Sequence, residues 1–183
     1  VVTGASKRGW TSWLTGAADP RVLGIAPMVY DNLNLPEQMR QQVACYGGYS
    51  EQISDYDEAD LPRMLATPEG RFLADLVDPF VLRGRLGVPK LLIHGSNDRY
   101  WTLESANLYY DDLPGDKHVL YVPNCGHGLK QLPRVLQALG AFTDACAEGR
   151  TLPRLDWIYH EVADGLRLTV TPGGRPVRAI AWV

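Results

Sequence analysis

Val1-Val2-Thr3-Gly4-Ala5-Ser6-Lys7-Arg8-Gly9-Trp10 is the stretch that decides the fold of this chain. An apolar strand end leads into a turn of small residues, and a helix that begins with charged residues follows. This layout is typical of a nucleophile elbow, in which a serine hydroxyl is held up at the carboxyl end of a strand. Gly4 lets the strand and the helix approach closely, because a Cβ there would crowd the turn. The second glycine of the usual Gly-x-Ser-x-Gly pattern comes one residue late, at Gly9.

In two later stretches an apolar run is again followed by a residue that could act in catalysis. Residues 91–98, Leu-Leu-Ile-His-Gly-Ser-Asn-Asp, are predicted to form a buried strand that delivers Asp98 at its carboxyl end. Residues 119–128, Val-Leu-Tyr-Val-Pro-Asn-Cys-Gly-His-Gly, place His127 in the loop after a further strand. The order Ser, Asp, His is the one that α/β-hydrolase connectivity imposes. The ends of parallel strands meet in one crevice, so we expect Ser6, Asp98 and His127 to converge there.

These three residue types suit nucleophilic catalysis. A serine hydroxyl is a weak nucleophile until a neighbouring base takes its proton, and histidine can serve as base and then as acid. The aspartate would hold the imidazole in the required tautomer and stabilise its charged form. Lys7, directly after the serine, would offer its backbone N–H to the oxyanion of the intermediate. The competing interpretations are an N-cap serine, a turn aspartate and a surface histidine, but the order and the strand ends together favour the triad.

A second candidate exists for the acid. Residues 22–30 are predicted to form the strand after the elbow helix, and Asp31 follows that strand directly. We favour Asp98, because its Gly-Ser-Asn turn leaves the side chain free to reach the histidine loop, and we expect Asp31 to shape the floor of the cleft or to cap the next segment. Further aspartates on polar stretches are predicted to be solvated: Asp55, Asp57, Asp60, Asp111 and Asp112. Cys125 is a poor rival nucleophile, since a cysteine so close on the same loop would rarely face His127.

The chain is predicted to combine two parts. Residues 1–150 fit part of an α/β-hydrolase domain, a parallel sheet flanked by helices, with residues 31–87 as a cap or lid insertion that contains helical stretches at 36–45, 61–66 and 69–77. Helices are also expected at 103–113 and 132–146. Residues 151–183 are predicted to begin a small antiparallel β module, with strands at 157–161, 166–171 and 177–183. Tyr46 and Tyr49 of the insertion, and Tyr100 and Trp101 after the acid, are candidate cleft residues, whereas Trp10 and Trp13 are expected in the core.

Composition excludes several other functions. The chain has 183 residues, 45% of them hydrophobic, and a net charge of −3, with no basic stripe that would indicate nucleic-acid binding. No apolar run approaches the length of a membrane span. Its three cysteines, Cys45, Cys125 and Cys146, have no metal-ligand spacing, so we expect no metal and no cofactor. The expected partner is a small-molecule or acyl substrate.

Several strings together resemble the PhoPQ-activated pathogenicity-related family of α/β-hydrolase-like proteins: 4–10, 19–22, 46–50, 67–70, 97–98, 100–101 and 126–128. The resemblance runs from Val1 to about Trp157, and in that family the serine is likewise followed by Lys-Arg-Gly. Arg99 departs from the family pattern, where proline would be expected. The resemblance implies a serine-hydrolase scaffold, and because the family includes exported bacterial proteins and autocrine growth repressors it also implies export to the periplasm or the cell exterior.

We therefore expect a serine hydrolase that acts through an acyl-enzyme on a carboxylic ester. A peptidase is a lower-ranked alternative, and so is a glucuronoyl-esterase-like enzyme, because the arginine that distinguishes those enzymes is Lys7 here. An alternative from a different class is a non-catalytic exported binding or signalling protein on the same scaffold. The chain starts inside a predicted strand, so we expect a fragment that lacks the second oxyanion donor and has little activity alone, since losing one such donor costs roughly a hundred- to a thousandfold in rate.

Overall fold

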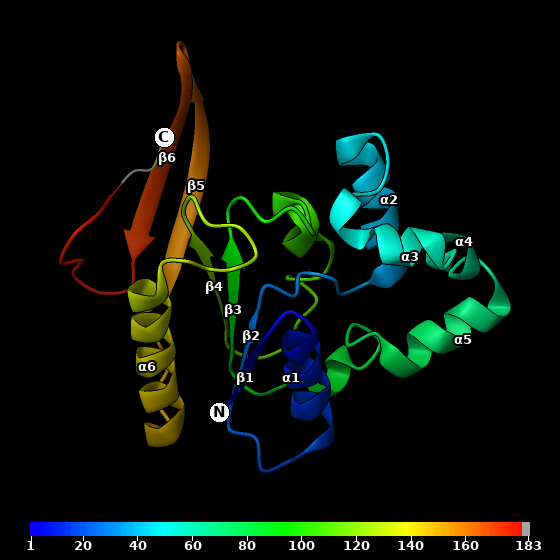
Figure 1. Ribbon diagram of the computed structural model, residues 1–183. Helices are drawn as coiled ribbons and strands as arrows, with labels where there is room; N and C mark the ends of the chain where they lie inside the picture. Colours follow the sequence, from blue (N-terminus) through cyan, green and yellow to red (C-terminus); the bar gives the residue numbers. More distant parts are fainter. Residues whose placement is uncertain (181–183) are drawn as a thin grey trace.

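The computed structural model describes residues 1–180, and its centre is a parallel sheet of four strands in the order β1-β2-β3-β4 (Figure 1). The strands are β1 (Val2–Ala5), β2 (Ile25–Met28), β3 (Lys90–Gly95) and β4 (Lys117–Val122). The predicted mixed α/β fold with a parallel sheet is confirmed. All four strands run in the same direction, so the residues that follow them lie at one edge of the sheet.

Strand β2 is shorter than the predicted 22–30, and Pro27 weakens its pairing with β3. Ile25 N donates to Pro89 O at 3.0 Å and Val29 N donates to Ile93 O at 2.8 Å. The donor expected midway between them belongs to Pro27, which has no N–H. Strands β2 and β3 are accordingly paired only at Ile25 with Lys90 and at Met28 with Ile93, with the same register at both pairs.

Helices cover both faces of the sheet (Figure 1). On one face α1 (Lys7–Ala18) packs Trp13, which is fully buried, against Ile25 and Leu92. On the other face α6 (Leu132–Glu148) packs Val135 and Phe142 against the side chains of β3 that alternate with Leu92. The parallel sheet therefore has a hydrophobic core on each side, as expected when helices cover both faces.

Between β2 and β3 the chain forms a group of short helices that lies to one side of the sheet (Figure 1). They are α2 (Leu35–Tyr46), η1 (Glu51–Ile53), α3 (Ser54–Glu58), α4 (Leu61–Met64), α5 (Pro68–Val77) and η2 (Arg83–Arg85). The buried carboxylate of Asp78 accepts hydrogen bonds from Leu35 N at 2.7 Å and from Phe80 N at 2.9 Å. One side chain therefore joins the start of this segment to its end.

The segment 103–113 differs from its predicted α-helix. It is a 3₁₀ helix, η3 (Leu103–Leu108), followed by turns. Lys117 Nζ, from β4, donates to the carbonyls of Tyr110, Asp111 and Leu113 at 2.6, 3.0 and 3.1 Å. A lysine from a neighbouring strand thus satisfies carbonyls in the turns that follow η3.

After α6, strands β5 (Leu155–Val162) and β6 (Gly165–Pro172) form an antiparallel hairpin, the predicted small β element. Of the predicted strand 177–183, residues 177–180 are not in a strand, and the rest lie outside the described residues.

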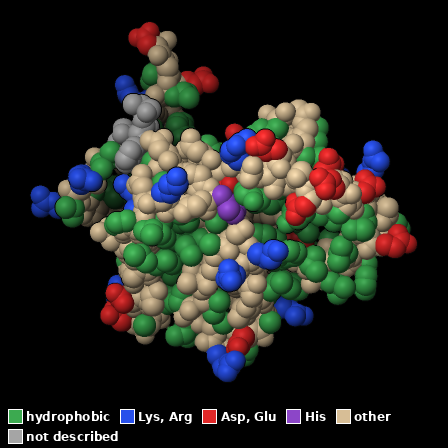
Figure 2. Space-filling view, in the orientation of Figure 1, with side chains coloured by type: hydrophobic (Ala, Val, Ile, Leu, Met, Phe, Trp, Pro, Cys, Tyr) green, Lys and Arg blue, Asp and Glu red, His purple; other side chains and the backbone are tan. Residues whose placement is uncertain are grey.

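Figure 2 shows acidic and basic side chains scattered over one face of the molecule, with acidic ones frequent over the helices after β2. Within residues 1–180, no helix is both long and apolar enough to cross a membrane.

Candidate active site

Ser6 stands between β1 and α1 in a strained backbone conformation. Its φ is 55° and its ψ is −122°, a combination that residues with a Cβ seldom adopt. Ser6 N donates to Met28 O at 2.8 Å, which ties the turn to the end of β2. Strain of this kind is expected where a turn must hold a reactive side chain, and it is the geometry of a nucleophile elbow.

The two glycines around Ser6 have clear steric reasons. A Cβ at Gly4 would lie 2.6 Å from Arg8 Cβ, and one at Gly9 would lie 2.8 Å from Met28 O and 2.9 Å from Tyr30 Cβ. Gly9 therefore lets α1 lie directly against the end of β2. The late position of the second glycine does not prevent it from providing this close packing.

His127 contacts Asp98 directly. His127 Nδ1–H donates to Asp98 Oδ2 at 2.9 Å, and the other carboxylate oxygen accepts from Tyr100 N at 3.0 Å. The Asp98 side chain is 8% exposed and that of His127 is 26% exposed, so the acid is shielded while the imidazole remains accessible. Tyr100 also stacks on the imidazole, with ring centroids 4.1 Å apart. The described residues include no hydrogen bond from Ser6 Oγ to His127, a contact that is often long before substrate binds.

The turn that carries Asp98 (the acid turn, residues 95–100) and the loop that carries His127 (the histidine loop, residues 123–128) are held against each other. Ser96 Oγ accepts from Asn124 N at 2.8 Å, and Asn97 N donates to Cys125 O at 2.9 Å. A Cβ at Gly95 would overlap the Cys125 carbonyl, so only glycine allows this approach. The contact between Asp98 and His127 therefore rests on paired backbone segments as well as on the two side chains.

A pocket of about 330 Å³ contains both Ser6 and His127. Lys7 lines it too, and as the first residue of α1 it has a backbone N–H without an acceptor inside the helix. The pocket further includes the expected cleft residues Tyr100 and Trp101. Its other lining residues were not predicted as site residues: Trp10, Val29, Tyr30, Gln52, Ile53, Ser54, Asp55 and Tyr56. Trp10, four residues after Ser6 on the same helix, could have been found from helical spacing, whereas residues 52–56 carry no such signal.

Three expected cleft residues lie elsewhere. Tyr46 lines an open hollow beside Arg99 and the outer side of Asp98, and Tyr49 lines a third hollow between α2 and α4. Asp31 is buried and is absent from the lining of the Ser6 pocket. Sequence spacing could not separate these positions, because the path of the chain after β2 decides which side of each helix meets the pocket.

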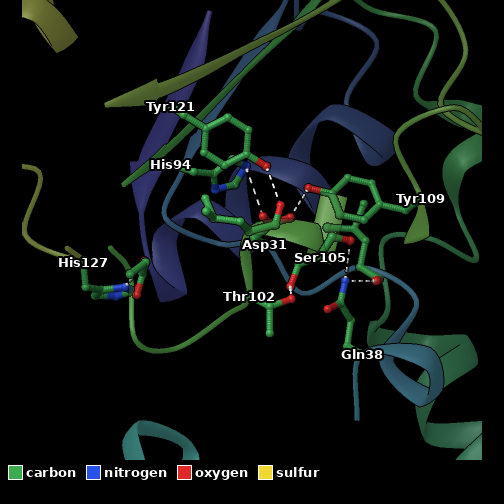
Figure 3. A network of polar contacts seen from close by, with 11 residues as sticks. Asp31, Gln38, His94, Thr102, Ser105, Tyr109, Tyr121 and His127 are labelled. Atoms are coloured by element: carbon green, nitrogen blue, oxygen red, sulfur yellow. Dashed lines mark hydrogen bonds and ion pairs between the residues drawn. The ribbon is translucent and has the colours of Figure 1, made fainter. Parts of the chain in front are cut away.

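Asp31 belongs to a separate buried cluster, which Figure 3 shows apart from His127. Tyr109 Oη donates to Asp31 Oδ1 at 2.5 Å, and His94 Nε2 lies 3.9 Å from Oδ2. Burial raises the pKa of the Asp31 carboxyl above its usual range, although His94 and Tyr109 oppose the shift. Burial and the nearby Asp31 likewise raise the pKa of the Tyr109 phenol. Of the two candidate acids, only Asp98 contacts His127.

This architecture defines an α/β-hydrolase fold, and solved structures share it. Acetyl xylan esterase from Paenibacillus sp. R4 is similar with a TM-score of 0.57 and 18% sequence identity, covering 78% of this chain and 43% of that one. Acetyl xylan esterase 1 from Thermoanaerobacterium sp. JW/SL YS485 is similar with a TM-score of 0.52 and 20% identity, covering 78% and 44%. At these identities the likeness establishes the fold alone.

The chain belongs to the PhoPQ-activated pathogenicity-related protein family, whose model matches residues 1–183. The resemblance noted from its motifs is thereby confirmed. Among known proteins it is 34% identical over 191 residues to autocrine proliferation repressor protein A of Dictyostelium discoideum. That match covers 100% of this chain and 38% of the relative, so the chain spans less than half of the relative's length.

Proposed function

We propose that the protein is a serine hydrolase that cleaves carboxylic esters, with Ser6 as nucleophile, His127 as base and acid, and Asp98 as the acid that orients it. The observation that carries this proposal is the 2.9 Å contact between Asp98 and His127, because His127 lines the same pocket as the strained Ser6. Neither a binding surface nor a structural core needs these three groups together at one strand edge.

The reaction follows from the position of each group. Ser6 Oγ attacks the ester carbonyl while His127 Nε2 takes the hydroxyl proton, and Asp98 stabilises the resulting imidazolium. The oxyanion accepts a hydrogen bond from Lys7 N–H. His127 then gives its proton to the leaving alkoxide, which departs as an alcohol. Water repeats the sequence on the acyl-enzyme, releases the carboxylic acid and restores Ser6.

A fluorophosphonate probe tests this proposal without knowledge of the substrate. The serine oxygen displaces fluoride at phosphorus, so an activated Ser6 gains a phosphonyl adduct that mass spectrometry can locate. We expect the adduct on Ser6, none on Ser6→Ala, and normal labelling of Thr11→Ala, which removes an exposed hydroxyl from the same helix. A folded protein that gains no adduct at Ser6 would contradict the proposal.

The relative's printed name, a repressor of proliferation, supports a second candidate, a non-catalytic signalling protein on the hydrolase scaffold. The two candidates differ in what Ser6→Ala does. A signalling protein should keep its effect on cells in that variant, and a hydrolase whose activity produces the effect should lose it. A peptidase or a glucuronoyl esterase would retain the same three residues, and hydrolysis of matched amides and glucuronate esters distinguishes them.

A further inference from the structure

The pocket beside Ser6 is lined by aromatic residues from four separate stretches of chain. Trp10 and Tyr30 stack on each other with ring centroids 5.5 Å apart and an interplanar angle of 11°. Tyr100 and Trp101 come from the turn after the acid, and Tyr56 comes from α3. Flat walls of this kind favour a planar apolar group, because aromatic pairs gain energy beyond the area they bury.

Hydrogen bonds to neighbouring segments hold two of these aromatic residues, Trp10 and Tyr100, in place. Trp10 Nε1 donates to Val77 O at 2.7 Å, which fixes the indole against the end of α5. The buried Gln42 donates to Tyr100 O at 2.7 Å and accepts from Ser50 N at 3.0 Å, which links α2 to the acid turn and to η1. The pocket is therefore formed before any ligand enters, which reduces the ordering cost of binding.

We propose that this pocket receives an aromatic ring of the ester substrate. The proposal rests on the proposed hydrolase function of the same site. A volume of about 330 Å³ accommodates a substituted ring and a short linker. A pyranose fits less well, since hydroxyls around its whole edge would need polar partners and five of the lining residues are tyrosine or tryptophan.

Matched ethyl esters test the ring preference, because ethanol as leaving group brings no ring of its own. We would compare ethyl 3-phenylpropanoate with ethyl 3-cyclohexylpropanoate by pH-stat titration. The two acyl groups have similar size, but only the first is planar. We expect kcat/KM to be about threefold to tenfold higher for the phenyl ester, the range that aromatic packing adds beyond burial. Equal values, or a preference for the cyclohexyl ester or for ethyl butanoate, would exclude the ring from the acyl side of the ester.

The side of the ester that carries the ring is resolved by two further substrates. 2-Phenylethyl acetate places the ring on the alcohol, and its control is 2-cyclohexylethyl acetate. A preference for the planar member in either pair supports a ring site, and the pair with the larger ratio shows whether the acyl or the alcohol group occupies it. Absence of a preference in both pairs overturns the inference.

Binding measurements separate failure of this inference from failure of the proposed function. In Ser6→Ala, which cannot form an acyl-enzyme, 3-phenylpropanoate should change the tryptophan fluorescence at a lower concentration than 3-cyclohexylpropanoate does. Selective binding of the planar compound in a protein that hydrolyses no ester supports the ring site while the hydrolase proposal fails. Ester hydrolysis without ring selectivity supports the hydrolase proposal and contradicts the ring site.

Discussion

Replacing Asp98 with asparagine should abolish catalysis through the tautomer of His127. Asp98 Oδ1 accepts from Tyr100 N and Oδ2 accepts from His127 Nδ1–H, so asparagine would keep its oxygen toward Tyr100 and turn its amide toward Nδ1. The imidazole would then carry its proton on Nε2 and could not take the proton of Ser6. A wrong tautomer of this kind costs about 10⁴-fold in kcat. Flipping the amide would leave Tyr100 N–H facing an NH₂ group, at a cost of about 1–3 kcal/mol.

The matched control is Asp31→Asn at the other strand end. Tyr109 can still donate to the asparagine oxygen, and His94 remains beside the amide, so we expect less than about a tenfold change. The assay is the second-order rate of fluorophosphonate labelling at Ser6, which needs an activated serine but no known substrate. If Asp31→Asn alone abolishes labelling, or if Asp98→Asn labels within tenfold of the unmodified protein, the assignment of the acid is refuted.

Three further expectations concern the loops and the buried cluster. Gly95→Ala should displace the histidine loop, and a displacement of about 1 Å is enough to lower the labelling rate by about 100-fold. Gly48→Ala is the control, because a Cβ there faces open space and should leave the labelling rate unchanged. Tyr100→Leu should slow labelling several-fold through loss of the ring on His127, and Tyr100→Phe should restore it. Asp31→Asn should also alter the pH dependence of unfolding in urea. Burial raises the Asp31 pKa in the folded state, so stability from this carboxyl is complete below the unfolded pKa and is lost as pH rises through the folded pKa. The stability of Asp31→Asn relative to the unmodified protein should therefore increase from pH 4 to pH 7, and a constant difference would contradict this account.

The parallel sheet was predictable because each strand ends in a recognisable turn. Apolar runs followed by Ser6, Asp98 and His127 indicated strand ends, and parallel strands bring their ends to one edge. The helix at 132–146 followed from its apolar spacing and is observed at Leu132–Glu148. These features depend on local pattern and on the order of elements, which a sequence contains directly.

Other features depended on contacts between distant residues. The predicted helix at 103–113 is a shorter 3₁₀ helix followed by turns, whose carbonyls are satisfied by Lys117 from a strand later in the chain. Trp10 packs against the core around Trp13, as expected, and it also lines the pocket beside Ser6, which was not predicted. Tyr46 and Tyr49 point to other hollows. Helical spacing cannot reveal which face of such a segment will meet a site.

The carboxylate of Asp78 joins the two ends of the helical segment between β2 and β3, so the chain between Leu35 and Asp78 forms a loop that is closed at its base. A second attachment lies at the acid turn, where Ser50 donates to Arg99 O and Glu51 pairs with the Arg99 side chain. Residues between these anchors can change without moving the strands that carry the reacting groups. Relatives could therefore exchange this loop and acquire new substrates while the chemistry at the strand ends stays the same.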